Sequence, residues 1–435
     1  MTTEQTEITP DEGSESALSE TELTTAAPEV LATSLGDYLD AWWRRIKNGE
    51  SGALPVIAGL VAIIIFFQIE RSAFLTDQNL VNLFEEAALY ILLGAAETFA
   101  LLLSEIDLSI GYGMGIAGFV LTELSAPPVN LPWWVAVIGA VAAVGFLGFV
   151  QGTLITRIGL PSFIVTLAGQ LAFLGIMLEL ANVDSTAVGG VIQLSPTSPI
   201  YKLVNSNMST SLGWIVLAVC LLLFAAVTLY RNRSRKARGL HTPPVGVTVL
   251  TLGMVAVAGI LLMYVCNNNR GAISVIRGMP WVFPFVFLII AVYSWMMART
   301  RTGRYIYAVG NNQEAARRAG IKVKWIVTFA FIMSGATAAL ASLVYTSTQG
   351  NMSTSLDGGS LVLYAVAAAV IGGTTLFGGR GRMVNALIGG LIIAVIFDGL
   401  GLMGVSPAVQ NIATAFVLLA AVSLDAIVRR RAAVR

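Results

Sequence analysis

The stretch RTRTGRYIYAVGNNQEAARRAGIKVKW, residues 299–325, lies between two long apolar runs and organises the rest of the chain. It holds seven basic side chains against a single acid, Glu314. Loops this basic beside membrane spans stay on the cytoplasmic side. The EAARRA segment that starts at Glu314 favours a helix, which Gly320 would end. Asn311 or Asn312 can cap its start. We therefore expect a structured cytoplasmic elbow that docks a soluble partner.

The composition places the chain in a membrane. Of its 435 residues, 56% are hydrophobic and 12% are charged, whereas soluble chains carry about 25% charged residues. The net charge of +1, with basic residues confined to loops, gives no indication of nucleic-acid binding. With two cysteines and one histidine, neither a disulfide framework, a metal site nor a histidine-based catalytic centre is indicated. We expect a polytopic membrane protein without a catalytic, metal or cofactor site.

Apolar runs of about 20 residues predict transmembrane helices. The candidate ranges are 52–69, 83–103, 110–125, 132–153, 162–181, 212–230, 246–265, 280–298, 326–345, 360–377, 383–401 and 409–428. Every second loop is rich in Lys and Arg, as expected when both termini are cytoplasmic. The weak points are the short, Gly-rich run 110–125 and the insert 231–280, which holds the seventh span. We predict an all-α polytopic fold with about twelve transmembrane helices, some broken or re-entrant.

The two ends of the chain differ from its apolar body. Residues 1–40 contain ten acids and no Lys or Arg, which predicts a disordered acidic tail. In residues 41–50, aromatic and basic side chains alternate as in an amphipathic segment at the headgroup level; the alternative is an extension of the first span. We expect the transmembrane domain at 51–428 and a basic cytoplasmic tail at 429–435.

Acidic side chains inside the apolar runs indicate either a translocation pathway or a role in helix packing. A charge at mid-membrane costs roughly 2.5–3.5 kcal/mol on insertion scales, so retained charges usually face the protein interior. The run SEIDLSIG, residues 104–111, adds carboxylates and hydroxyls between two apolar segments. A broken helix there would line a pathway, whereas the alternative is a polar turn at the membrane surface. The pathway candidates are Glu97, Glu105, Asp107, Ser109 and Asp398.

Two loops predicted on the same outer face share the hexapeptide NMSTSL, at residues 207–212 and 351–356. The repeat indicates either a paired docking surface for an external partner or a coincidence between loops rich in Ser and Thr. The residues leave both interpretations open.

Four stretches occur in a characteristic order. They are SEIDLSIG at 104–111, GLPSFIVTLAG at 159–169, GRYIYAVGNNQEAARRAG at 303–320 and GGTTLFGGRGR at 372–382. Together they resemble the membrane-spanning permease subunits of bacterial ATP-binding-cassette importers, in the branch that takes up ribose, xylose and related sugars. The resemblance runs from about residue 94 to residue 425. The second stretch and the extra span in 231–280 look most like the D-xylose-type permease.

The resemblance implies a homodimer in the bacterial cell membrane and the lipid bilayer around it. It also implies an ATPase subunit on the cytoplasmic face and an extracytoplasmic sugar-binding protein. The ATPase would be a separate chain, because no G-x-x-x-x-G-K-[ST] motif occurs here. Closure of the ATPase pair would push the helix at Glu314, and the spans would convert this push into alternating access.

The resemblance assigns ATPase coupling to the elbow. In it, Gly303 and Gly310 would act as hinges, and the arginines would meet acidic groups of the ATPase. Membrane topology alone explains the sign of these charges, but not the ordered spacing of Glu-Ala-Ala and Gly. The residues assigned to coupling are Gly303, Arg304, Gly310, Asn311, Glu314, Ala315, Ala316, Arg317, Arg318 and Gly320.

Two other functions remain as alternatives. A secondary transporter driven by a proton or sodium gradient would use the buried carboxylates as ion relays, but it leaves the elbow unexplained. A membrane scaffold or receptor would bind partners through the NMSTSL loops and the acidic tail. That function leaves the Gly-rich broken segments without a purpose.

Overall fold

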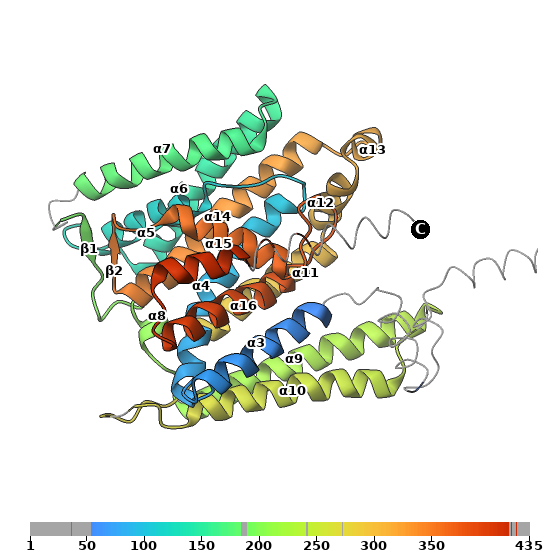
Figure 1. Cartoon of the computed structure of the whole chain (residues 1–435). Helices are drawn as coiled ribbons and strands as arrows, with labels where there is room; N and C mark the ends of the chain where they lie inside the picture. The colour runs from blue at the N-terminus through green and yellow to red at the C-terminus, as the bar shows by residue number, and fades with distance from the viewer. Residues whose placement is uncertain are drawn as a thin grey trace, which may run out of the picture. The chain divides into compact units, whose positions relative to one another are not determined.

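The part of the chain that the structure describes is mostly helical (Figure 1). The computed structural model describes residues 54–183, 189–240, 242–271 and 273–416, with the single positions 36, 419 and 423. The expected acidic tail, interfacial segment and basic tail lie outside the described residues, apart from Gly36. The all-α polytopic class predicted from the sequence is therefore confirmed on the part of the chain that the structure describes.

Helices occupy the predicted spans. The helices that coincide with the first eleven ranges are α3 (Leu54–Glu70), α4 (Asp77–Leu101), α5 (Ile110–Ser125), α6 (Trp133–Thr153), α7 (Ser162–Val183), α9 (Thr210–Ala237), α10 (Val245–Asn267), α11 (Val282–Arg299), α14 (Val323–Gln349), α15 (Gly358–Ile371) and α16 (Met383–Leu402). The twelfth range is described in part, and residues 407–416 are helical.

Length separates these helices into two groups. Eight described helices are long and apolar enough to cross a membrane, and three further apolar helices, including α5 and α15, are shorter. A helix that crosses the hydrocarbon core needs about 20 residues, so the 16 of α5 and the 14 of α15 fall short of a full crossing. The expectation of about twelve spans stays a prediction.

The chain divides into two compact units. The described part of the smaller unit, within residues 214–262, forms most of α9 and α10. Asn232 Nδ2 on α9 donates a 3.1 Å hydrogen bond to Thr248 Oγ1 on α10, and Gly259 lies against Leu217. The seventh predicted span, which the sequence places in an insert, is therefore α10 of this unit. The larger unit holds residues 52–213 and 263–435.

The core of the larger unit lies around α4 and α14. Helix α4 packs against α14, α15 and α16, and α14 also packs against α5 and α6. The backbones of α6 and α14 approach closely, because Gly148 lies against the Phe331 carbonyl and Gly335 lies against the Val144 carbonyl. A side chain at either glycine would collide with backbone. Such small residues allow helices to associate inside a bilayer.

The extended structure in the described residues is short. Strand β1 (Val191–Gln193) pairs antiparallel with β2 (Asn351–Ser353), with Ile192 opposite Met352. Helix α8 (Lys202–Asn205) follows β1. The second NMSTSL segment thus forms β2, whereas the first forms a bridge between Asn207 and Pro280. Both methionines, Met208 and Met352, are buried. A docking role for these loops stays a prediction.

Candidate coupling elbow and buried carboxylates

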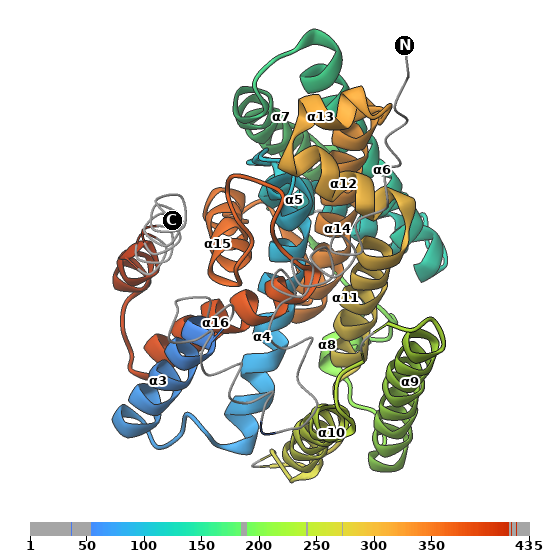
Figure 2. The same ribbon diagram turned by 90° about the vertical axis from the view of Figure 1, so that its right-hand side faces the viewer.

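The stretch 299–325 forms two helices at the end of α11. Helix α12 (Arg301–Asn311) begins at Thr300, whose Oγ1 accepts a 3.2 Å hydrogen bond from the Gly303 amide. Helix α13 (Gln313–Arg318) begins at Asn312, whose Oδ1 accepts a 2.8 Å bond from the Ala315 amide. Figure 2 shows both helices beside α14. The predicted helix is therefore confirmed, and α12 is an additional one.

Of the two candidate caps, Asn312 performs the capping. The side chain of Asn311 instead donates a 2.8 Å hydrogen bond to the Tyr307 carbonyl, one turn back in α12. Gly320 follows α13 with a φ of +82°, a conformation that glycine adopts without strain. Both ends of α13 are thus set by residues that the sequence singled out.

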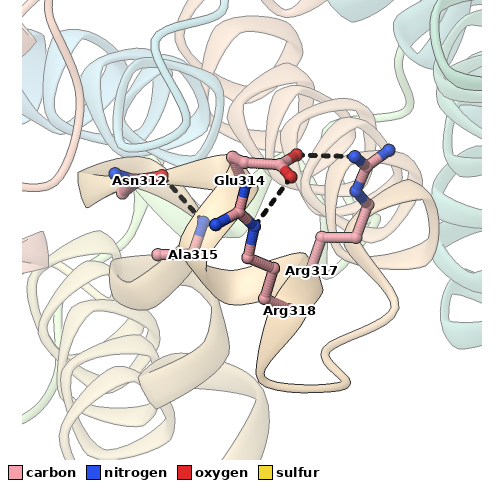
Figure 3. Close-up of polar contacts among 5 residues, drawn as sticks. All are labelled: Asn312, Glu314, Ala315, Arg317 and Arg318. Atoms are coloured by element: carbon pink, nitrogen blue, oxygen red, sulfur yellow. Dashed lines mark hydrogen bonds and ion pairs between the residues drawn. The ribbon is translucent and has the colours of Figure 1, made fainter.

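The outer face of α13 is charged and accessible. The Glu314 carboxylate pairs with Arg317 at 2.7 Å and with Arg318 at 3.1 Å (Figure 3). The hydrogen bonds from Arg317 and Arg318 hold the pKa of Glu314 below its usual value, so the group is ionised near neutrality. The two arginines are 72% and 79% exposed, and exposed pairs of this kind contribute little to stability. All three side chains are therefore available to exchange their pairing for that of a partner.

The inner face of the elbow is apolar. Ile306 and Val309 on α12 and Ala316 on α13 are buried in one cluster with Leu102 and Phe331. Their spacing places them along one side of the two helices. Because Ala316 is buried while Glu314 and Ala315 are exposed, the Glu-Ala-Ala segment joins the core to the surface.

Helix α12 also contacts two other segments through backbone atoms. Gly310 lies against the Leu102 carbonyl, at the end of α4, and against the Gly379 amide. The Gly379 amide in turn donates a 2.9 Å hydrogen bond to the Leu102 carbonyl. Tyr307 Oη donates to the Gly381 carbonyl at 2.8 Å. The Gly-dense loop 372–382 therefore packs between the elbow and α4.

Gly303 and Gly310 both lie inside α12 with a helical backbone. At Gly303 an added Cβ would collide with the backbone of Met297, and at Gly310 with that of Leu102. The structure thus places both glycines at close contacts. A hinge role for them stays a prediction.

Three of the five pathway candidates meet beside the end of α4. The Asp107 amide donates to Glu97 Oε1 at 3.3 Å. Asp107 Oδ1 accepts from Ser109 Oγ at 2.6 Å, and its Oδ2 accepts from Ser334 Oγ on α14 at 2.8 Å. Gln151 Nε2 on α6 donates to Ser109 Oγ at 3.0 Å. This buried network joins α4, the loop that precedes α5, α6 and α14.

The other two candidates lie apart from this network. Glu105 accepts a hydrogen bond from Ser162 at the start of α7. Asp398 on α16 accepts a 2.7 Å bond from Asn79 Nδ2 near the start of α4. The five candidate side chains therefore do not form one connected cluster.

Sequence reasoning missed Gln151, Ser334 and helix α12. Gln151 is a single amide within an apolar run, which is the usual mark of an interior polar contact, so it could have been found. Ser334 gave no signal, because serine is common in membrane helices. Thr300 together with the spacing of Ile306 and Val309 would have predicted α12.

These features define a helical, polytopic membrane transport component with an elbow that packs on an apolar core and a separate buried polar network. The chain belongs to the family described as branched-chain amino acid transport system / permease component, whose model matches residues 79–422. The predicted resemblance to permease subunits is thereby confirmed. The chain is a transport component and a multi-pass protein of the bacterial cell membrane.

Several relatives are similar over almost their whole length. The xylose transport system permease protein XylH of Escherichia coli (strain K12) is 34% identical over 388 residues, which are 89% of this chain and 94% of the relative. The D-allose transport system permease protein AlsC of the same strain is 31% identical over 87% and 92% of the two chains. The ribose import permease protein RbsC is 29% identical over 89% and 95%. No solved structure matches this chain.

Proposed function

We propose that this chain is the membrane-spanning subunit of an ATP-binding-cassette importer for a monosaccharide, a pentose such as xylose or a related sugar. The names of three relatives, which refer to xylose, allose and ribose, support a monosaccharide cargo. Family membership favours this function over a gradient-driven transporter or a scaffold, because the family is described as a permease component.

The proposed assembly is a homodimer with an ATPase on the cytoplasmic face and a sugar-binding protein on the outer face. Its transmembrane domain covers residues 51–428 with about twelve spans, preceded by the acidic tail 1–40 and the interfacial segment 41–50. Both termini are cytoplasmic, and residues 429–435 form the basic tail. Basic residues in the elbow and in alternate loops support this orientation.

The observation that carries the proposal is the two-faced elbow. Its outer face presents Glu314, Arg317 and Arg318, while its inner face is buried through Ile306 and Val309. A partner that pushes on α13 therefore moves side chains that are packed into the core. The contact of Gly310 with Leu102 transmits this displacement to α4. Alternating access follows when α4 and α14 shift together.

The buried network is proposed to hold the pathway helices together. Glu97, Asp107 and Ser109 lie where the displacement from α12 reaches α4, and they tie this end to α6 and α14. In this function they move as a unit and carry no ions. Glu105 forms the adjacent contact with α7.

The test is purification of the chain in detergent with the ATPase encoded beside it, followed by ATP hydrolysis with and without the sugar-loaded binding protein. We expect a stable complex whose hydrolysis the loaded binding protein stimulates. A Glu314→Arg variant is expected to lose this stimulation and to keep its unfolding temperature. Ion-gradient-driven uptake without any associated ATPase would contradict the proposal and favour the secondary transporter.

A further inference from the structure

A cavity of about 550 Å³ lies in the larger unit. This volume falls within the ~300–1,000 Å³ range of small-molecule sites. Helix α4 contributes Glu85, Glu86 and Tyr90, and α14 contributes Tyr345 and Gln349. Thr348, Phe397 and Asp398 also line it.

The cavity lies far from the elbow. Tyr345 and Gln349 are at the end of α14 opposite to Val323, which adjoins the elbow. With a rise of ~1.5 Å per residue, Tyr345 and Gln349 are about 33 and 39 Å from the start of α14. Glu85 and Glu86 are in the first half of α4, whereas Leu102 follows its last turn. The cavity therefore faces the side opposite to the proposed ATPase contact.

Several polar groups that line the cavity have no hydrogen-bond partner among the described residues. Glu85, Glu86 and the hydroxyls of Tyr90 and Tyr345 make no hydrogen bond to any residue that the structure describes. Asp398 is oriented through one carboxylate oxygen by Asn79. These groups combine acceptors with hydroxyls that can both donate and accept. They match a ligand that carries many hydroxyls.

One wall of the cavity is aromatic. Tyr90 and Phe397 are stacked with ring centroids 5.8 Å apart, and Tyr364 packs edge-on against Phe397 at 4.8 Å. Tyr364 Oη donates to Asn411 Oδ1 at 2.5 Å, which fixes the outer ring. A pyranose has a polar rim and an apolar face of C–H groups. A rigid aromatic wall beside free acceptors therefore complements it better than a uniformly polar pocket would.

Charge around the cavity is only partly balanced. The buried Arg270 attracts the Glu85 carboxylate, whereas the carboxylates of Glu86 and Asp398 repel each other. Carboxylates can be satisfied by hydroxyl donors without a counterion. The acidic lining also suits a cation. A transport experiment distinguishes a bound sugar from a bound cation.

We infer that this cavity is a binding site for a monosaccharide on its way through the permease, in which the carboxylates and tyrosine hydroxyls bind the sugar hydroxyls and the Tyr90–Phe397 wall contacts its apolar face. The inference rests on the proposed function. It adds that the permease itself selects among sugars. Of the five pathway candidates, only Asp398 lines this site.

The test uses the complete transporter in proteoliposomes, with ATPase and binding protein, and D-xylose, D-ribose and D-allose as probes. Two near-isosteric cavity variants, Glu86→Gln and Tyr345→Phe, are compared with Glu70→Gln and Tyr230→Phe, whose exposed side chains do not line the cavity. The readouts are the ATP hydrolysed per sugar imported and the ratio of the three uptake rates. We expect the cavity variants to change this ratio by about three- to tenfold, as the loss of one hydrogen bond does. The two control variants are expected to change neither readout.

The outcomes distinguish the site from the function. If the wild-type complex imports none of the three sugars with ATP, the proposed function fails, and the site with it. If it imports them and the cavity variants behave like the controls, the site alone is overturned. A changed dependence on Na⁺ or K⁺ with an unchanged sugar ratio also overturns it, and assigns the cavity to a cation.

A second measurement does not depend on the activity of the variants. Thr348→Cys, made together with Cys220→Ser, places a thiol on the cavity wall. Sugar turnover by the complete transporter is expected to slow its labelling by a charged methanethiosulfonate reagent. Labelling at the same rate with and without the sugars would contradict occupancy of the cavity.

Discussion

Ser334 Oγ donates a 2.8 Å hydrogen bond to Asp107 Oδ2 across 227 residues of sequence, and both side chains are buried. The bond joins the middle of α14 to the loop that separates α4 from α5. A buried carboxyl oxygen that loses its donor carries a desolvation penalty of about 1–3 kcal/mol. This single hydroxyl therefore supports the junction between α14 and the loop that follows α4.

Ser334→Ala is expected to lower the free energy of unfolding by about 1–3 kcal/mol, since Asp107 Oδ2 is left without its donor. The measurement is thermal unfolding of the detergent-solubilised complex. Ser342→Ala is the matched control, because Ser342 is equally buried on α14 but donates only to the Ala339 carbonyl within its own helix. Equal destabilisation by the two variants would argue against a special role of the bond.

Glu97→Gln separates the importer from the gradient-driven alternative. Glu97 Oε2 is fully buried and has no hydrogen-bond partner among the described residues, while Oε1 accepts from the Asp107 amide. Glutamine keeps that acceptor and removes the ionisable carboxyl group, so ATP-driven uptake is expected to persist. The measurement is uptake by proteoliposomes that contain the complete transporter. Complete loss of uptake in a variant that still folds would favour an ion-relay role for Glu97.

Gly310→Ala is expected to displace α12, because the new Cβ would collide with the Leu102 carbonyl and the Gly379 amide. Overpacking of this kind costs about 1–3 kcal/mol. We expect weaker stimulation of ATP hydrolysis by the loaded binding protein and a lower unfolding temperature. Gly175→Ala in α7 is the control, since no atom lies within 4 Å of an added Cβ there. Normal coupling in Gly310→Ala would disprove the close contact.

Asn312→Ala is expected to loosen α13, because loss of an N-cap side chain costs about 1 kcal/mol. Amide hydrogen exchange in residues 313–319 should become about fivefold faster, the change that ~1 kcal/mol of local opening implies. Asn311→Ala serves as the comparison, because its side chain bonds to Tyr307 in α12 and does not cap α13. Faster exchange of α13 in both variants would reassign the cap.

Periodicity and apolar run length predicted most of the fold, because each membrane helix must satisfy its own backbone hydrogen bonds. Contacts that depend on tertiary approach were not predictable in the same way. Strands β1 and β2 have three residues each and pair across the chain, so neither gives a local signal. Helix α12 was missed because only Gly303, Ile306 and Val309 of its eleven residues are buried, so it lacks the long apolar run of a membrane span.

The candidate site was predictable only where residue type restricts the structure. Asn312 and Gly320 were identified by their capping preferences, and both hold those positions. Asp107 and Glu97 were recognised as buried acidic residues, but the contact between them depends on the chain reversal after α4. The position of Asp398 within its apolar run did not reveal that its side chain lies apart from Glu97 and Asp107.

The contact among Gly310, Leu102 and Gly379 has a mechanical consequence. It is made by backbone atoms, so no side chain can change rotamer to absorb a displacement. Close-packed protein interiors have low compressibility and transmit strain. This contact should therefore be stiff, so that a small displacement of the elbow would displace α4 by nearly the same distance. A substitution that lengthens a neighbouring side chain would alter the stiffness of this contact less than Gly310→Ala, which places a new atom inside it.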